Sequence, residues 1–212
     1  MGKFRGRINA IITALKAIYV HYGCTRYDGW GHIGIGTQVA SPSVISGKHN
    51  IFLGNHVNID WDSVLYATNA KLIMGDNSGA AVGCTFITGN HRPLPGEWLK
   101  ARGNDNLEGK DIVIEEEVWV GAKSIILAGT HIGRGAIVSA GSVLRGIKIP
   151  PYAIVAGNPA KIVGYRYTPE EIVYHESQLY PEQKRIPLSK LQKNYDKYFA
   201  NREKIVDYIS PY

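Results

Sequence analysis

The chain has 212 residues, of which 44% are hydrophobic and 20% are charged, values that are ordinary for a soluble protein of one sizeable domain. Its formal net charge of +6 favours acidic partners, such as nucleic acid, anionic lipid or a phosphorylated cofactor, without choosing among them. The two cysteines, Cys24 and Cys84, have no metal-ligand spacing, so we expect free buried thiols in a reducing, cytoplasmic compartment.

The N-terminal segment, residues 1–29, begins with basic residues that precede an apolar run over residues 8–20. No small-residue cleavage site follows this run, which argues against a signal peptide. Thirteen residues are also too few to span a bilayer, and Lys16 interrupts them. We therefore predict a basic amphipathic helix that packs on its own protein or on a neighbouring subunit, with peripheral membrane contact as the alternative.

The middle of the chain contains an internal repeat of six residues. This period fits neither an α-helix nor a half-buried strand, but it fits a short strand followed by a turn. Three such sides close one triangular coil whose aliphatic residues point inward. The repeat is clearest where an aliphatic residue returns at every sixth position, namely Ile114, Val120, Ile126, Ile132, Val138 and Leu144.

The same frame occurs earlier with small slips, in sets that begin at Ile33, Leu53 and Met74. We predict an all-β core of parallel strands, about 24 Å tall, in which no coil can bury its inner face alone. The spacing does not fix the hand of the coil, and the usual crossover rule favours a right-handed one. The five predicted coils are residues 33–50, 53–70, 74–91, 114–131 and 132–149.

An irregular excursion, at about residues 90–111, interrupts the frame between the third and fourth coils. It is rich in Pro, Gly, Asn and charged residues, and long irregular segments inside compact repeats are usually functional or disordered. Trp98 and Leu99 argue against disorder because they need a surface to pack on. We expect Trp98 to help shape the substrate site.

The C-terminal extension, residues 166–212, follows two prolines, Pro150 and Pro151, that end the regular ladder. Thr168 and the Pro-Glu-Glu after it are typical of a helix start. We predict one or two helices that cap the column or contact another subunit. The basic, tyrosine-rich tail contains no known nucleic-acid motif, so we predict no nucleic-acid partner.

Three stretches resemble one known family. Residues 117–122 read Glu-Val-Trp-Val-Gly-Ala, residues 88–93 read Thr-Gly-Asn-His-Arg-Pro, and residues 155–161 read Val-Ala-Gly-Asn-Pro-Ala-Lys. Over residues 30–165 the chain resembles the hexapeptide-repeat acyltransferases. Within them it is most similar to the galactoside and maltose O-acetyltransferase-like branch, which includes capsule and exopolysaccharide O-acetyltransferases. The resemblance implies a left-handed parallel β-helix and a homotrimer.

The resemblance also implies the chemistry. An acetyl group would pass from acetyl-CoA to a hydroxyl of a sugar or polysaccharide precursor, with His91 as general base, a role that suits an imidazole near neutral pH. Asp60 stands where several family members have asparagine, and an ionised carboxylate cannot donate to an oxyanion, so its role differs in detail. Asp62 is a neighbour able to substitute, and Trp61 is a candidate for stacking on a sugar ring or for packing outside the column.

The predicted acyl-donor site uses the later coils. By resemblance, small residues there leave the backbone open to the pantetheine arm, and two cations meet the nucleotide phosphates. We predict no metal, because the histidines show no ligand spacing. The residues expected to bind the donor are Gly121, Ala122 and Ala140 for pantetheine, Arg145 and Lys161 for phosphates, and Asn158 at the same end.

Other functions remain open at this point. The acceptor of the same chemistry could be serine, an amino sugar or an antibiotic. A non-catalytic β-helix scaffold is a second class, which the presence of His91 argues against. A hexapeptide carbonic anhydrase is a third, and it would need three histidines converging on a metal between subunits.

Overall fold

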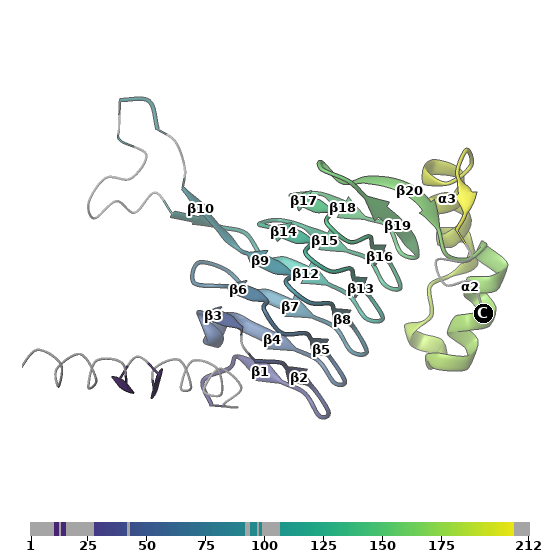
Figure 1. Ribbon diagram of the computed structural model, residues 1–212. Helices are drawn as coiled ribbons and strands as arrows, with labels where there is room; N and C mark the ends of the chain where they lie inside the picture. Colours follow the sequence, from purple (N-terminus) through teal and green to yellow (C-terminus); the bar gives the residue numbers. More distant parts are fainter. Residues whose placement is uncertain are drawn as a thin grey trace, which may run out of the picture.

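The protein is a left-handed parallel β-helix of about five coils, described by a computed structural model (Figure 1). The strands stack in parallel along the column, and two helices lie at its C-terminal end. The structure describes residues 11–12, 14–15, 28–41, 43–91, 94–96, 98 and 107–205.

Three sheets form the three faces of the column, which we call faces A, B and C. Face A comprises β1 (His32–Ile33), β4 (Ile51–Leu53), β7 (Leu72–Met74), β12 (Ile112–Ile114), β15 (His131–Ile132) and β18 (Lys148–Ile149). Face B comprises β2 (Gln38–Val39), β5 (Asn58–Ile59), β8 (Gly79–Ala80), β13 (Trp119–Val120), β16 (Ile137–Val138) and β19 (Ala153–Ala156). Face C comprises β3 (Val44–Ser46), β6 (Val64–Tyr66), β9 (Thr85–Ile87), β14 (Ile125–Leu127) and β17 (Val143–Arg145).

The chain turns between the faces at three corners. The A–B corner contains residues 34–37, 54–57, 75–78, 115–118, 133–136 and 150–152. The B–C corner contains residues 60–63, 81–84, 121–124 and 139–142. The C–A corner contains the 3₁₀ turn η1 (Lys48–Asn50) and residues 67–71, 88–91, 107–111, 128–130 and 146–147.

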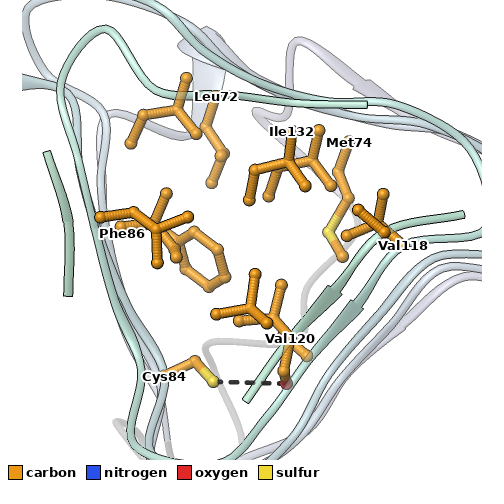
Figure 2. Packing of buried hydrophobic residues seen from close by; sticks show 14 of the residues in the cluster. Leu72, Met74, Cys84, Phe86, Val118, Val120 and Ile132 are labelled. Carbon is orange, nitrogen blue, oxygen red and sulfur yellow. Dashed lines mark hydrogen bonds between the residues drawn. The ribbon is translucent and has the colours of Figure 1, made fainter. Parts of the chain in front are cut away.

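The core is a stack of inward-pointing aliphatic side chains, as the six-residue frame predicted (Figure 2). Residues at equivalent positions pair directly between coils, for example Phe86 with Ile126 and Ile126 with Leu144. The frame residues of the second to fifth coils are all buried, namely Leu53, Ile59, Leu65, Met74, Ala80, Phe86, Ile114, Val120, Ile126, Ile132, Val138 and Leu144.

Each turn of the A–B corner needs one residue in the left-handed region. For a residue other than glycine this conformation costs about 1–2 kcal/mol, and it persists because the stacked coils fix the backbone. The residues with positive φ at this corner are Gly36, His56, Asn77, Glu117, Gly135 and Tyr152, with values between 54° and 70°. The same backbone turn therefore recurs in every coil, although the residue with positive φ differs from coil to coil.

The C-terminal end is closed by a β-hairpin and two helices. β19 pairs antiparallel with β20 (Lys161–Tyr165), which in turn pairs with β21 (Glu203–Lys204). Thr168 caps α2 (Pro169–Leu179) with the predicted helix start, including a capping box with Glu171. The 3₁₀ turn η2 (Glu182–Lys184) leads to α3 (Leu188–Tyr198), so the predicted helical extension contains two helices.

Buried polar contacts join α2 to the A–B corner. Glu176 is only 1% exposed, and its carboxylate accepts hydrogen bonds from Tyr152 Oη at 3.0 Å and Arg134 Nη1 at 3.1 Å. At the same corner, Glu117 is hydrogen-bonded to His175 Nε2 of α2 at 3.0 Å. The buried carboxylate of Glu176 thus has hydrogen-bond partners on the column. These contacts hold α2 in one position against the A–B corner.

The predicted N-terminal helix lies mostly outside the described residues. Residues 11–12 and 14–15 are helical, and the described apolar side chains Ile11, Ile12 and Leu15 are exposed. Within the described ranges, no helix is both long and apolar enough to cross a membrane. Leu99 and Cys24 also lie outside the described residues, whereas Cys84 is a free, buried thiol as expected.

Candidate functional site

His91 stands at the base of the excursion, where a short ribbon holds it. The ribbon pairs β10 (Gly89–His91) antiparallel with β11 (Leu107–Gly109), placing His91 opposite Leu107. Gly109 lets the ribbon lie close to the preceding coil, because a Cβ there would meet the Asn69 carbonyl oxygen at 2.2 Å. The excursion is therefore anchored at its base, and His91 occupies a fixed position at the C–A corner.

His91 is half-buried, and one of its ring nitrogens lacks a hydrogen-bond partner among the described residues. Its backbone N–H donates to the side-chain oxygen of Asn90 at 2.9 Å. Its Nδ1 is buried and has no hydrogen-bond partner in the part of the chain that the structure describes. Since buried polar atoms are nearly always paired, this nitrogen indicates a partner outside the described part of the chain.

Two adjoining hollows, of about 360 and 370 Å³, lie beside the strand that carries His91. Asn90, Ala128 and Arg145 line both of them, and Lys110 lines the first. The sequence did not single out Asn90 or Lys110 as site residues. Asn90 belongs to the stretch that carries His91, and Lys110 lies at the end of the excursion. Their nearness to His91 was the one sequence signal that could have identified them as site residues.

The second predicted group lies at the B–C corner. Asp60 is half-buried, Asp62 is exposed in a left-handed conformation with φ 60°, and Trp61 between them is 54% exposed. Trp61 therefore does not pack into the column and presents its ring to the surroundings. The three side chains line one corner.

Within one chain, Asp60 and His91 lie on opposite edges of face C. The strands of face C run from the B–C corner, which holds Asp60, to the C–A corner, which holds His91. The structure of the single chain therefore does not bring them together. A site that uses both needs the B–C corner of one subunit to meet the C–A corner of another.

The predicted donor-binding residues divide in the same way. Ala122 and Ala140 stack at the B–C corner, where the Gly141 N–H donates to the Ala122 carbonyl at 2.8 Å. Ala140 is exposed, and its backbone groups form no hydrogen bond within the described part of the chain. Free amide and carbonyl groups at this position could serve a pantetheine arm.

Gly121 has a different local role. It is buried, its N–H donates to the Val138 carbonyl at 2.7 Å, and its carbonyl accepts from Cys84 Sγ at 3.3 Å. A Cβ at this position would meet the Ala140 backbone nitrogen at 2.5 Å. Glycine is required here for coil stacking, so any effect of Gly121 on a donor acts by positioning Ala140.

The predicted phosphate contacts lie at both edges of face C. Lys161, the first residue of β20, and Asn158 are exposed beyond the B–C corner. Arg145 ends β17 at the C–A corner and lines the two hollows near His91. The structure therefore groups Arg145 with His91, and Lys161 with Ala140 and Asn158.

Cys84 and two other histidines have structural roles. Burial, and to a smaller extent the charge of Asp60, raises the pKa of the Cys84 thiol, which keeps it protonated and inert. His131 Nε2 bonds Glu115 at 2.7 Å, and His175 Nε2 bonds Glu117 at 3.0 Å. Among the described residues, no three His, Cys, Asp or Glu side chains cluster as metal ligands do.

Trp98 is 86% exposed in the excursion, and it does not pack against the core among the described residues. Its predicted role at the substrate site remains a prediction, because the neighbouring residues 97 and 99–106 lie outside the described ranges.

The column matches known proteins. Residues 111–146 match the family model described as bacterial transferase hexapeptide (six repeats). A chloramphenicol acetyltransferase of Agrobacterium fabrum is 28% identical over 154 residues, which cover 64% of this chain and 73% of that protein.

Two solved structures are similar over comparable lengths. A hexapeptide-repeat acetyltransferase of Vibrio cholerae, complexed with acetyl coenzyme A, is 27% identical with a TM-score of 0.60, covering 70% of this chain and 82% of that one. A maltose O-acetyltransferase of Clostridium difficile is 26% identical with a TM-score of 0.58, covering 64% and 70%. The resemblance that the three sequence stretches indicated is confirmed.

Proposed function

We propose that this chain, a hexapeptide-repeat acetyltransferase, moves an acetyl group from acetyl-CoA to a hydroxyl of a sugar or polysaccharide precursor, with His91 as general base. The observation that carries the proposal is the position of His91. It is fixed by the β10–β11 ribbon next to Asn90, which lines two hollows, and it keeps a buried ring nitrogen without a partner in the described chain.

The proposed reaction needs one proton relay. His91 accepts the proton of the acceptor hydroxyl as its oxygen attacks the carbonyl carbon of the thioester. The tetrahedral intermediate collapses, the C–S bond breaks, and the acetyl group remains on the acceptor as an ester. The CoA thiolate leaves and recovers the proton from His91. A positioned base of this kind contributes roughly 10²–10⁴ to the rate.

Face C supports a homotrimer in which the site forms between subunits. Its outward-facing positions are largely apolar, and Val44, Tyr66 and Ile125 are 56%, 47% and 36% exposed. An apolar face of this extent on a soluble column favours contact with another copy. Such packing would place the B–C corner of one subunit against the C–A corner of the next.

In this arrangement the two corners supply complementary parts of one site. The B–C corner offers the free backbone of Ala140 to pantetheine, with Lys161 as a phosphate contact. The C–A corner offers His91 and Arg145. Asp60 would accept a hydrogen bond from the acceptor or orient His91 from across the interface.

Trp61 favours a saccharide acceptor, since its half-exposed indole ring stands between Asp60 and Asp62. Aromatic rings flanked by carboxylates suit the apolar face and the hydroxyls of a sugar. The maltose O-acetyltransferase neighbour agrees with this choice. The chloramphenicol acetyltransferase relative keeps a small antibiotic as the second candidate acceptor.

An acceptor screen tests this proposal. The protein is incubated with acetyl-CoA and a panel of mono- and oligosaccharides, chloramphenicol, serine and glucosamine, and free thiol release is measured. We expect acceptor-dependent thiol release with a saccharide, and mass spectrometry should find one added acetyl group per product. Thiol release only with chloramphenicol would show that the acceptor is a small antibiotic and not a saccharide. No thiol release with any acceptor would contradict acetyl transfer.

A further inference from the structure

A further cavity lies over face A and the A–B corner, and it shares no lining residue with the two hollows beside β10. It has a volume of about 390 Å³ and is lined by the last coils of the column on one side and the η2–α3 segment on the other. Lys148 of β18 contributes from the column, and Lys184 and Lys190 contribute from the helical extension. The acetyl-transfer chemistry uses none of these residues.

The cavity has a fixed outer wall. Arg134 Nη1 donates to the Lys184 carbonyl at 2.8 Å, and the Ile186 N–H donates to the buried Glu176 carboxylate at 2.5 Å. Arg185 is held by the Tyr180 carbonyl, to which its Nε donates at 2.9 Å. The wall is therefore preformed, as most small-molecule sites are.

The charge inside the cavity is unbalanced. Glu115 is its one acidic lining residue, and both of its oxygens are taken, by His131 Nε2 at 2.7 Å and the Arg134 N–H at 2.9 Å. Lys148, Lys184 and Lys190 form no ion pair with any residue the structure describes. Three lysines thus line one cavity, together with a single carboxylate whose two oxygens already have hydrogen-bond partners.

The identity of the free cations indicates the ligand. The guanidinium groups of Arg134 and Arg185, which would suit a planar carboxylate, already bond protein oxygens. The unused donors are lysines, which act as point charges and suit the tetrahedral oxygens of a phosphate. The first turn of α3 beside them contains no acidic residue, which further favours an anion.

From these observations we infer that the face A cavity binds a phosphorylated small molecule, of sugar-phosphate to nucleotide size, at a site separate from acetyl transfer. The volume exceeds what a single phosphate needs and falls within the range of small-molecule pockets. The ligand joins the column to the helical extension, because its phosphate contacts come from both.

The test is a binding measurement on the full chain and does not depend on acetyl transfer. Isothermal titration with glucose 1-phosphate is compared with glucuronate and with glucose, which match it in size but carry a carboxylate or no charge. We expect glucose 1-phosphate to bind most tightly, with an affinity that falls as salt is added. Saturating CoA should leave this binding unchanged.

Two single variants probe the two walls. Lys148→Gln on the column and Lys190→Gln on α3 should each weaken glucose 1-phosphate binding by roughly fivefold or more, as the loss of a charge-assisted contact predicts. Lys193→Gln, an exposed α3 lysine outside the cavity, is the matched control and should bind normally. Unchanged affinity in both cavity variants, equal binding of glucuronate, displacement by CoA, or no binding at millimolar concentration would each overturn the inference.

Discussion

His91 is the residue on which the proposed chemistry depends, and the β10–β11 ribbon fixes it independently of the column core. Its removal should therefore affect turnover rather than folding. We expect His91→Ala to lower kcat by about a hundredfold or more, the typical contribution of a general base. Thiol release measures the rate, and the melting temperature should stay close to that of the unmodified protein.

His49 provides the control for this variant, because it is exposed in η1 at the same corner but far along the column from the hollows. His49→Ala should retain normal turnover. If His91→Ala also retained it, His91 would have no part in the mechanism.

Asp60 stands where several family members have asparagine, and this difference can be tested. If its oxygen accepts a hydrogen bond from the acceptor or from His91, an amide oxygen can do the same. Asp60→Asn should keep most of the activity, whereas Asp60→Ala should lose roughly tenfold or more, as expected for a contact to a charged group. Equal rates for Asp60→Ala and the unmodified protein would remove Asp60 from the site.

At the residue scale, sequence reasoning located the motif but not its surroundings. The stretch around His91 indicated the base, and the structure places it beside a hollow. Lys110 was not predicted because its proximity to Arg145 arises from stacking of the fourth and fifth coils, which single-residue patterns do not encode. Gly121 was assigned to the donor, whereas the backbone contact to Ala140 gives it a structural reason to be glycine.

At the element scale, the period of six predicted the strands and the buried positions because each inward residue must stack on its equivalent in the next coil. The ribbon of β10 and β11 was missed, since one antiparallel pairing across an irregular excursion leaves no periodic signal. The helix start at Thr168 was predicted from its capping residues. The network beneath α2 was not, because its partners are far apart in sequence.

That network yields a stability prediction for the helical extension. Tyr152 is fully buried and donates its hydroxyl hydrogen to Glu176, and burial followed by the charge of Glu176 raises the pKa of this phenol, so it remains a donor across the usual pH range. Tyr152→Phe leaves Glu176 with one donor fewer. We expect a loss of about 1.5–3 kcal/mol in the free energy of unfolding.

Urea denaturation followed by circular dichroism measures this loss. The matched control is Tyr174→Phe on the same helix, because Tyr174 is 69% exposed and should tolerate the change. Equal midpoints for the two variants would mean that the contact between Tyr152 and Glu176 does not stabilise the fold.

At the scale of the whole molecule, the apolar outer surface of face C predicts self-association. Ile125 lies on β14, next to the middle strand of this face, and is 36% exposed. Ile125→Glu would bury a charge in the proposed interface, so we expect monomers in multi-angle light scattering and loss of acetyl transfer. Val173→Glu, at an apolar position of α2 that is 41% exposed, should remain trimeric. A monomeric unmodified protein that is fully active would contradict this assembly.

The sequence predicted the number of coils, and the resemblance supplied the hand and the expected trimer. The resemblance implied a site between subunits, and the corner that each hexad turn occupies now places the site residues at two edges of face C. Asp60 and His91 are separated in the single chain for this reason. The cavity on face A was not predicted, because it forms where the last coils meet a segment about 40 residues further along the chain.

The most direct test of an intersubunit site with His91 as base is a mixing experiment. His91→Ala and Asp60→Ala proteins, each of low activity, are unfolded together in equal amounts, refolded and assayed for thiol release. If each site takes His91 from one subunit and Asp60 from its neighbour, random mixed trimers should recover about a quarter of the unmodified activity. Activity no higher than that of the two separate variants would contradict the account.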